Sequence, residues 1–233
     1  MKYLVIPDIH LKPEIIEQAD AAMQTGKFDA AIFLGDFVDD WDEGNNVGLY
    51  EKTLNAVTNF MRKYSNSRIC LGNHDVSYLW QLQESGYSDI AEVTVNKIIS
   101  EIIKEFGNRV AIMHKVDNVI FSHAGLTQTW LMRYCADAMG DFNYIVDSVN
   151  KMSPSKLWDD DSPIWARPDK WVKFYSKDYL QVVGHSPVGR VSFYPLQNVL
   201  VCDTFSTFPN GNHIGEWKLI CVDTETKEWS YIE

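Results

Sequence analysis

The sequence is poor in cysteine and in basic residues, and it contains no long apolar run. Four cysteines occur among 233 residues and none forms a Cys-x-x-Cys pair, which excludes a disulfide framework and indicates buried thiols in a reducing compartment. The first apolar run, residues 3–6, is too short for the core of a signal peptide, and no stretch approaches the length of a membrane span. We therefore expect a cytoplasmic protein without a membrane partner.

Acidic residues outnumber basic ones by 32 to 21, which gives a formal net charge of −11 and a pI of about 4.9. A surface of this sign repels nucleic acid, so we expect no nucleic-acid partner. It does not exclude a small anionic substrate, because bound metal ions reverse the field locally. The length fits one large α/β domain over residues 1–233, and the 45% share of hydrophobic residues is sufficient for a sizeable core.

Short apolar runs alternate with helical patterns over the first half of the chain, and this order indicates βαβ units. The predicted strands are residues 3–6, 30–34 and 68–71, and the predicted helices are residues 13–25, 49–64 and 95–106. The second half is predicted to be mainly antiparallel, with strands at residues 110–116, 119–122, 181–183, 199–202, 217–222 and 229–232. An insertion at about residues 127–178 interrupts them, helical over 127–151 and a long loop over 153–177.

Polar motifs directly follow five of the predicted strands. They are Asp8-x-His10, Gly35-Asp36-x-x-Asp39, Gly72-Asn73-His74-Asp75, His123-Ala124-Gly125 and Gly184-His185-Ser186-Pro187. Ligands in α/β sheets lie beyond the carboxyl ends of the strands, so these motifs are expected to converge on one site. Their Asp, Asn and His side chains suit divalent metal ions. A loop cap explains any single motif equally well, but five in this order predict a metal centre.

The five motifs together resemble those of the calcineurin-like metallophosphoesterase superfamily. Two further segments, Ile164-Trp165-Ala166-Arg167 and Cys202-Asp203-Thr204, resemble motifs of its phosphoprotein phosphatase branch, particularly small bacterial and phage serine/threonine protein phosphatases. The resemblance implies a four-layer α/β/β/α sandwich with a helical insertion, and two divalent metal ions at one edge. Manganese is the expected metal, with iron and zinc as the alternatives.

The resemblance also implies a role for each motif residue. Asp8, His10 and Asp36 would hold the first metal, and Asp36, Asn73, His123 and His185 would hold the second, so that Asp36 bridges the two. A hydroxide between the metals would attack a phosphate monoester. His74 occupies the position of the general acid and Asp39 that of its orienting partner. Arg167 and Asn73 would bind the phosphate group.

Two departures from the branch pattern leave the substrate open between a phosphoprotein and a nucleotide. Asp40 stands where the branch has an arginine that binds phosphate, and Phe205 stands where it has a glycine. The main prediction is a protein-phosphatase-like monoesterase. The alternatives are a hydrolase of dinucleoside polyphosphates or cyclic phosphodiesters, and a metal-binding scaffold without activity.

Two composition features carry smaller predictions. Four tryptophans fall in predicted loops near the motifs, and they either pack against the protein or stack on a nucleobase; these are Trp41, Trp158, Trp165 and Trp171. We favour packing. The run of three aspartates at residues 159–161 is interpreted as a solvated charge run rather than a cation site.

Overall fold

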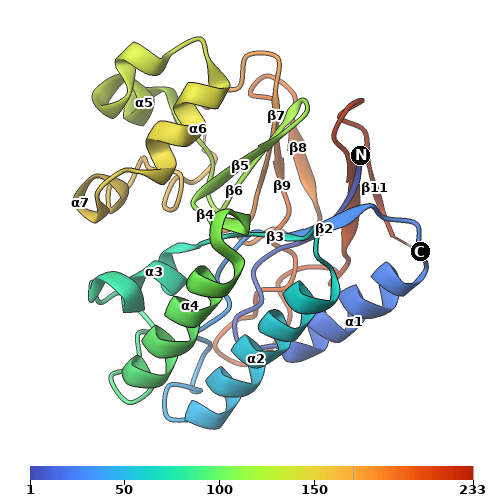
Figure 1. The fold of residues 1–233 in the computed structure, drawn as a ribbon, viewed down its shortest axis with the longest axis vertical. Helices are drawn as coiled ribbons and strands as arrows, with labels where there is room; N and C mark the ends of the chain where they lie inside the picture. Colours follow the sequence, from blue (N-terminus) through green and yellow to red (C-terminus); the bar gives the residue numbers. More distant parts are fainter. Residues whose placement is uncertain (170, 233) are drawn as a thin grey trace.

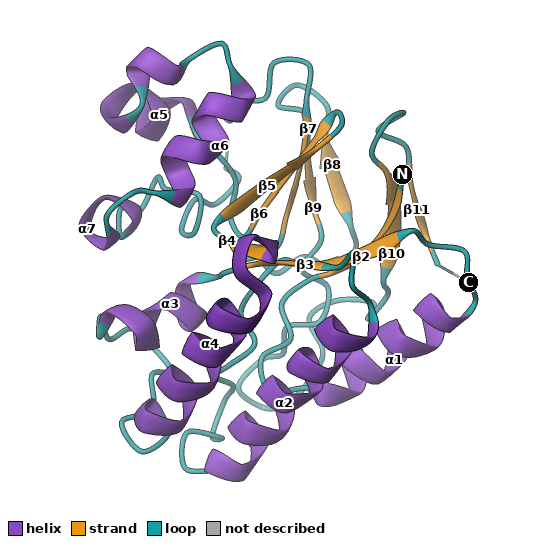
Figure 2. Cartoon of the chain, in the orientation of Figure 1, coloured by secondary structure: helices purple, strands orange, loops and turns teal. Residues whose placement is uncertain are grey.

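The computed structural model describes residues 1–169 and 171–232 of the chain. Within these residues the strands form two mixed sheets (Figure 2). In spatial order, the six-stranded sheet consists of β11 (Trp229–Tyr231), β10 (Ile220–Asp223), β1 (Lys2–Ile6), β2 (Ala30–Phe33), β3 (Arg68–Cys70) and β4 (Val110–Ala111). The five-stranded sheet consists of β5 (Met113–Val116), β6 (Val119–Ser122), β7 (Leu180–Val183), β9 (Val199–Val201) and β8 (Ser192–Tyr194).

The helices form two groups. Helices α1 (Pro13–Gln24), α2 (Val47–Lys63), α3 (Asn73–Trp80) and α4 (Glu92–Phe106) lie on the outer side of the six-stranded sheet, below it in Figure 1. Helices α5 (Gln128–Tyr134), α6 (Phe142–Asn150) and α7 (Pro154–Leu157) gather beyond β5, against which α6 packs. The short 3₁₀ helices η1 (Gly107–Arg109) and η2 (Ala136–Ala138) follow α4 and α5. In the described part of the chain, every helix is too short or too polar to cross a bilayer.

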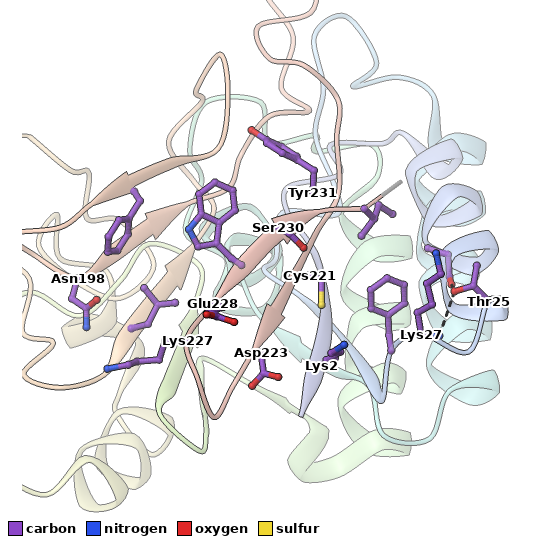
Figure 3. A pocket seen from close by; sticks show the side chains of 16 residues that line it. Lys2, Thr25, Lys27, Asn198, Cys221, Asp223, Lys227, Glu228, Ser230 and Tyr231 are labelled. Atoms are coloured by element: carbon purple, nitrogen blue, oxygen red, sulfur yellow. Dashed lines mark hydrogen bonds between the residues drawn. The ribbon is translucent and has the colours of Figure 1, made fainter.

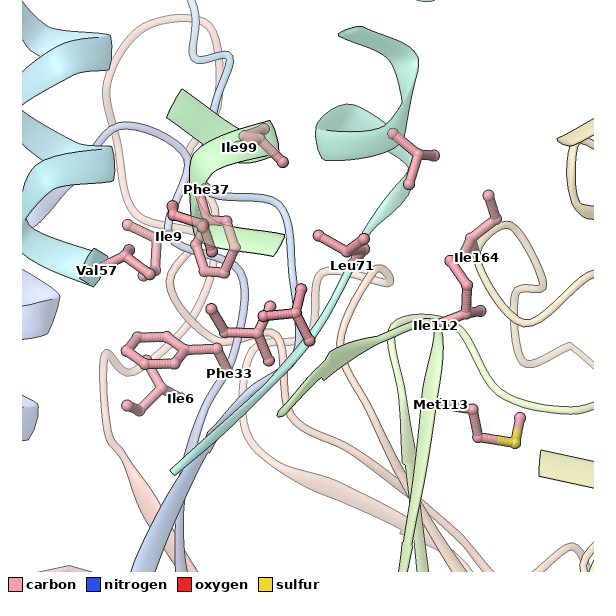
Figure 4. Close-up of a cluster of buried hydrophobic side chains, with 14 of the residues drawn as sticks. Ile6, Ile9, Phe33, Phe37, Val57, Leu71, Ile99, Ile112, Met113 and Ile164 are labelled. Carbon is pink, nitrogen blue, oxygen red and sulfur yellow. The ribbon is translucent and has the colours of Figure 1, made fainter. Parts of the chain in front are cut away.

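Alternation along the strands separates two apolar layers. In β1, Tyr3 and Val5 point between the sheets, whereas Leu4 and Ile6 belong to the layer beneath the first group of helices. Figure 4 shows part of this second layer, where Ile6 lies beside Phe33 of β2. Because both faces of β1 are covered, its sequence is continuously apolar rather than alternating.

The outer face of the five-stranded sheet is covered by the insertion. Val199 and Val201 of β9 pack there against Ala166 and Phe174 of the segment that follows α7. The layers therefore run from helices through two sheets to the insertion, which confirms the predicted α/β/β/α sandwich.

Strand direction in the second half differs from the prediction. β7 runs parallel to β6 and to β9, with Phe121 opposite Val182 and Val183 opposite Val201. The prediction of a mainly antiparallel second half is therefore wrong for the centre of this sheet. Parallel pairing brings the carboxyl ends of β6, β7 and β9 to one edge, which is the arrangement that the motifs after them need.

The structure also corrects several element boundaries. The strand predicted over residues 110–116 divides at Ile112 into β4 and β5, which belong to different sheets. The helix predicted over residues 127–151 is broken into α5 and α6, because Asp141 caps a new helix start by accepting the backbone N–H groups of Asn143 and Tyr144. The loop predicted over residues 153–177 contains α7. Helix α3 and strand β8 were not predicted.

Candidate metal centre

Two histidines at the ends of parallel strands turn their lone pairs toward each other. His123 follows β6 and donates from Nδ1 to the carbonyl oxygen of Leu34 at 2.8 Å. His185 follows β7 and donates from Nε2 to the carbonyl oxygen of Trp165 at 3.0 Å. These hydrogen bonds fix the tautomer of each ring and leave the other nitrogen as an acceptor. The two acceptor nitrogens, His123 Nε2 and His185 Nδ1, lie 3.0 Å apart.

Two oxygen acceptors complete this group. Asn73 Oδ1 lies 2.9 Å from His123 Nε2, and Asp36 Oδ2 lies 3.2 Å from the same nitrogen. Three possible ligand atoms thus surround His123 Nε2, an arrangement that repels itself unless a proton or a metal ion lies between them. Nitrogen and oxygen donors of this kind fit a divalent transition metal. Burial lowers the pKa of His185 well below its usual value, so this ring is held neutral, as a metal ligand must be.

A second group forms around the same aspartate. Ligand atoms of His10, Asp36 and His74 lie close enough to hold one ion, and so do those of Asp36, His123 and His185. His10 Nδ1 contacts the backbone oxygen of Asp39 at 2.8 Å, which leaves Nε2 directed at Asp36 Oδ2, 3.9 Å away. Asp36 is therefore common to both groups, the position predicted for a bridging carboxylate.

Electrostatics at Asp36 agree with this shared position. Burial alone would raise its pKa, but the imidazoles of His123 and His74 outweigh burial and hold the pKa well below its usual range. Burial would likewise lower the pKa of His123, yet the Asp36 carboxylate raises it to about 9. The pocket around Asp36 thus attracts positive charge.

Asp8 is placed differently from its predicted partners. It is buried, and both of its carboxylate oxygens accept the backbone N–H of His185, at 2.9 and 3.1 Å. One oxygen lies 3.9 Å from His123 Nδ1. Among the described residues, the groups able to hold an ion do not include Asp8. Its role as a ligand of the first metal stays a prediction.

Several site residues adopt a backbone conformation that side chains rarely take. His10, Asp36, Asp39 and His185 have φ values of 43°, 52°, 62° and 61°, in the left-handed region. Such strain persists where surrounding contacts enforce it, and it concentrates at functional sites.

Asp75 supplies one of the contacts that hold the strained turn at Asp36. Its carboxylate accepts the backbone N–H groups of Asp36 at 2.8 Å, Phe37 at 2.9 Å and Gly72 at 2.9 Å. This buried side chain ties the turn after β2 to the start of α3. The sequence motif contains Asp75, but the motif alone does not indicate this role.

His74 and Asp39 form the pair that the sequence predicts. His74 Nδ1 lies 2.9 Å from Asp39 Oδ2, while Asp39 Oδ1 accepts hydrogen bonds from Tyr50 at 2.9 Å and Tyr78 at 2.5 Å. Burial would lower the pKa of His74, but the carboxylates of Asp36 and Asp39 outweigh it and raise the pKa to about 10. At neutral pH the ring is therefore protonated, the form that a general acid needs.

A cavity of about 500 Å³ opens onto these groups. His10, Asp36, His74, His185 and Arg167 are among the residues that line it. Arg167 donates from Nη1 to the backbone oxygen of His185 at 2.8 Å, which fixes its guanidinium next to the metal groups. The structure thus brings all of the predicted site residues into one pocket or its immediate shell, where Asp8 contacts the backbone of His185.

The departures from the branch pattern have structural explanations. Asp40 is paired with Lys12, whose Nζ lies 2.6 Å from Oδ2, so it is not a lone anion at the cavity wall. Phe205 is fully buried and packs against Trp217, with ring centroids 5.5 Å apart, so it does not enter the site.

The acidic run at residues 159–161 is paired with a basic side chain. Asp159 forms an ion pair with Arg133.

The four loop tryptophans divide into two kinds. Trp158 and Trp165 pack against each other with ring centroids 5.1 Å apart, as the packing prediction expects. Trp171 is 78% exposed and lies outside the cavity lining. Trp41 is 57% exposed and lines the cavity, with its ring held by a 2.8 Å hydrogen bond from Nε1 to the backbone oxygen of Thr207. The packing prediction is therefore wrong for Trp41 and for Trp171, because both side chains are mostly exposed.

A larger hollow, of about 970 Å³, lies away from this chemistry. It is found near the amino end of β1, between β10–β11 and the end of α1 (Figure 3). Charges of both signs line it, including Lys2, Lys27, Asp223 and Glu228. Its lining contains no residue of the five motifs, so we place the functional site in the smaller cavity.

Comparison with known proteins identifies the family. The family model described as calcineurin-like phosphoesterase matches residues 1–226. The chain belongs to this family. It is accordingly a hydrolase of phosphoester bonds, and the family implies divalent metal ions as cofactors. No curated protein matches the chain.

Solved structures of similar fold include two protein phosphatases. One is a cold-active protein tyrosine phosphatase of a Shewanella species, with 17% identity and a TM-score of 0.58, covering 100% of this chain and 80% of the other. Another is a protein serine/threonine phosphatase from Saccharomyces cerevisiae, with 15% identity and a TM-score of 0.57, covering 95% of this chain and 72% of the other. At these identities the likeness concerns the fold.

Proposed function

We propose that this calcineurin-like phosphoesterase hydrolyses phosphate monoesters at a pair of divalent metal ions, in the manner of a protein phosphatase. The observation that carries the proposal is the position of Asp36, whose carboxylate belongs to two of the three groups of described side chains that could hold a metal ion. Only a carboxylate offers one anionic oxygen to each of two cations. Residues 1–233 would form one catalytic domain with an insertion at about 127–178, which the family match over residues 1–226 supports.

The side chains around Asp36 would hold the metals as the sequence resemblance implies. His123, His185 and Asn73 would bind one ion with Asp36, and His10 and Asp8 would bind the other with Asp36. When bound, such a pair acidifies water and neutralises the charge that develops on the phosphate. Manganese is the proposed metal, with iron and zinc as the alternatives, because Asp, Asn and His donors suit all three.

The remaining site residues would act on the substrate. His74 would give its proton to the leaving oxygen, and Asp39 would hold its ring in the required orientation. Arg167 would bind the oxygens of the phosphate together with Asn73, since a guanidinium presents paired N–H donors that match them. Replacing Arg167 with alanine is expected to raise KM for monoesters or lower kcat.

Hydrolysis of p-nitrophenyl phosphate tests the proposal. Protein stripped with a chelator should be inactive, and addition of Mn²⁺ should restore turnover. A variant in which Asp36 is replaced by asparagine should stay inactive at the same metal concentration. A protein that binds Mn²⁺ but never turns over this substrate would instead be the scaffold alternative.

A nucleotide hydrolase is the second candidate, and the placement of Trp41 favours it. An aromatic face fixed on the cavity wall can stack on a base, a contact worth about 1–3 kcal/mol. A panel of a phosphoserine peptide, a mononucleotide and diadenosine tetraphosphate separates the candidates. A kcat/KM that is highest for the peptide supports the protein phosphatase, and one that is highest for either nucleotide supports the alternative.

A further inference from the structure

Glu84 lies against the metal groups although no motif contains it. It belongs to the loop between α3 and α4, and its side chain is only 7% exposed. Its Oε2 accepts a hydrogen bond from Asn73 Nδ2 at 2.8 Å, and its Oε1 lies 3.3 Å from His74 Nδ1. Oε1 has no hydrogen-bond partner among the described residues. A buried carboxylate is costly unless it is paired, and the partners of Glu84 are these two residues of the site.

The loop is built to return Glu84 to the start of α3. Gln81 ends the helix in the left-handed conformation, with a φ of 55°, which reverses the chain. The backbone N–H of Leu82 then donates a hydrogen bond to the carbonyl oxygen of Ser77, and the backbone N–H of Tyr87 donates one to the carbonyl oxygen of Glu84. The side chain of Glu84 thereby reaches residues ten and eleven positions earlier in the sequence.

The amide of Asn73 has two possible orientations, and Glu84 favours one of them. In the structure its oxygen faces His123 Nε2 at 2.9 Å while its nitrogen donates to Glu84. A flip of the amide would bring its oxygen against the Glu84 carboxylate, which repels it. The same flip would point the amide N–H groups of Asn73 at the His123 ring. Asn73 could then offer no lone pair to a metal ion on that side. The orientation that leaves the oxygen ready for a metal is therefore the one that Glu84 stabilises.

We propose that Glu84 is a positioning residue that orients Asn73 as a metal ligand. Because Asn73 and His74 are neighbours in the first turn of α3, the same carboxylate contacts both the ligand and the proposed acid. This inference rests on the proposed function, since it assigns Asn73 to the metal site. Outer partners of this kind typically contribute about 10–100-fold to metal affinity.

The inference is tested by titrating Mn²⁺ into metal-free protein by calorimetry, which needs no activity. Glu84→Ala should weaken Mn²⁺ binding about 10–100-fold. Glu84→Gln should bind almost as the wild type does, because its Oε1 can accept the same hydrogen bond. Glu84→Met fills the space of the glutamate side chain but offers no carboxylate or amide oxygen to accept the hydrogen bond. Its Mn²⁺ affinity should match that of Glu84→Ala, and it takes the place of Glu84→Ala in the titration if that variant fails to fold. Asp89→Asn, an exposed charge change in the same loop, is the matched control and should leave affinity unchanged.

A double-mutant comparison separates positioning from a general structural effect. Asn73→Ala combined with Glu84→Ala should bind Mn²⁺ no more weakly than Asn73→Ala alone, since Glu84 acts through Asn73. Additive losses, or a Glu84→Gln variant as weak as Glu84→Ala, would overturn the inference. So would unchanged affinity in Glu84→Ala and Glu84→Met while the wild type binds Mn²⁺ and hydrolyses p-nitrophenyl phosphate. A wild type that neither binds Mn²⁺ nor hydrolyses that ester would show instead that the proposed function has failed.

Discussion

Replacing His74 with asparagine removes the proposed proton donor and keeps a polar side chain. The carboxylates around His74 raise its pKa to about 10, so at pH 7 the wild-type ring carries the proton that a basic leaving group requires. We expect kcat for phenyl phosphate to fall about 10²–10⁴-fold in His74→Asn. We expect kcat for p-nitrophenyl phosphate to fall much less, because nitrophenolate leaves readily without a proton.

The contribution of Asp39 to the same step can be derived from its contact with His74. A hydrogen bond of 2.9 Å between a carboxylate and a charged ring is worth about 1.5–3 kcal/mol, which is about 10–150-fold in rate. Asp39→Asn should therefore be less impaired than His74→Asn on phenyl phosphate. Because Asp39 acts through His74, the double variant should be no slower than His74→Asn alone.

Steady-state kinetics on both esters, with the metal content of each variant measured in parallel, check these values. Equal losses on phenyl and p-nitrophenyl phosphate would refute the assignment of His74 as the acid. Multiplied losses in the double variant would refute the action of Asp39 through His74. A loss of metal in His74→Asn would assign the ring to metal binding, and the reasoning about leaving groups would then be void.

Three further predictions address other parts of the chain. Trp41→Ala should raise KM for mononucleotides about 5–150-fold, as expected from the loss of one stacking contact. Trp171→Ala, at an exposed tryptophan outside the cavity, should leave KM unchanged, and a Trp41→Ala variant with the wild-type KM would remove the base-stacking role. Burial lowers the pKa of His114 to about 4 from 6.5. As the pH falls, His114 is therefore protonated in the unfolded chain before it is protonated in the folded protein, so the unfolding free energy should fall by about 3 kcal/mol between pH 6.5 and pH 4. Urea unfolding of wild type and His114→Gln checks this, and an identical pH dependence in both would contradict it. A Cβ on Gly184 would overlap the Asp8 carboxylate, so Gly184→Ala should lower the unfolding free energy by about 1–3 kcal/mol and weaken Mn²⁺ binding. A variant with the wild-type unfolding free energy and Mn²⁺ affinity would show that Asp8 moves aside without cost.

The site was predictable because its residues sit where local signals are strong. The apolar runs before Asp36, Asn73 and His185 each lead into a glycine, and those before Asp8 and His123 give way directly to polar motif residues or to proline, so the positions of these side chains follow from the end of an apolar run. Ligand convergence then follows from the geometry of strand ends in an α/β sheet. The layered fold followed from the same alternation of apolar runs and helical patterns.

The direction of the central strands could not be derived from the same signals. β6 and β7 are separated by the whole insertion, and their parallel pairing is decided by contacts such as Phe121 opposite Val182. Likewise, residues 110–116 form one unbroken run in which nothing marks Ile112 as the point where the chain changes sheets. Both features depend on packing between segments that are distant in sequence.

Two side chains outside the motifs, to which we assign proposed roles, do not stand out in the sequence for a related reason. Glu84 stands in a polar loop where an acidic residue is unremarkable, and its proximity to Asn73 arises from a chain reversal at Gln81. For Trp41 the sequence favours packing, because tryptophan buries a large area and a single aromatic residue does not indicate whether it faces the core or a cavity. Only the fold distinguishes these cases.

The metal content of the protein tests the central claim most directly. Wild-type protein reconstituted with Mn²⁺ and freed of excess metal should contain two ions per chain by elemental analysis, because Asp36 is shared by two groups of side chains that could hold an ion. Asp36→Asn should lose both ions together. A wild type that retains a single ion or none, or an Asp36→Asn variant that still holds two, would contradict the account.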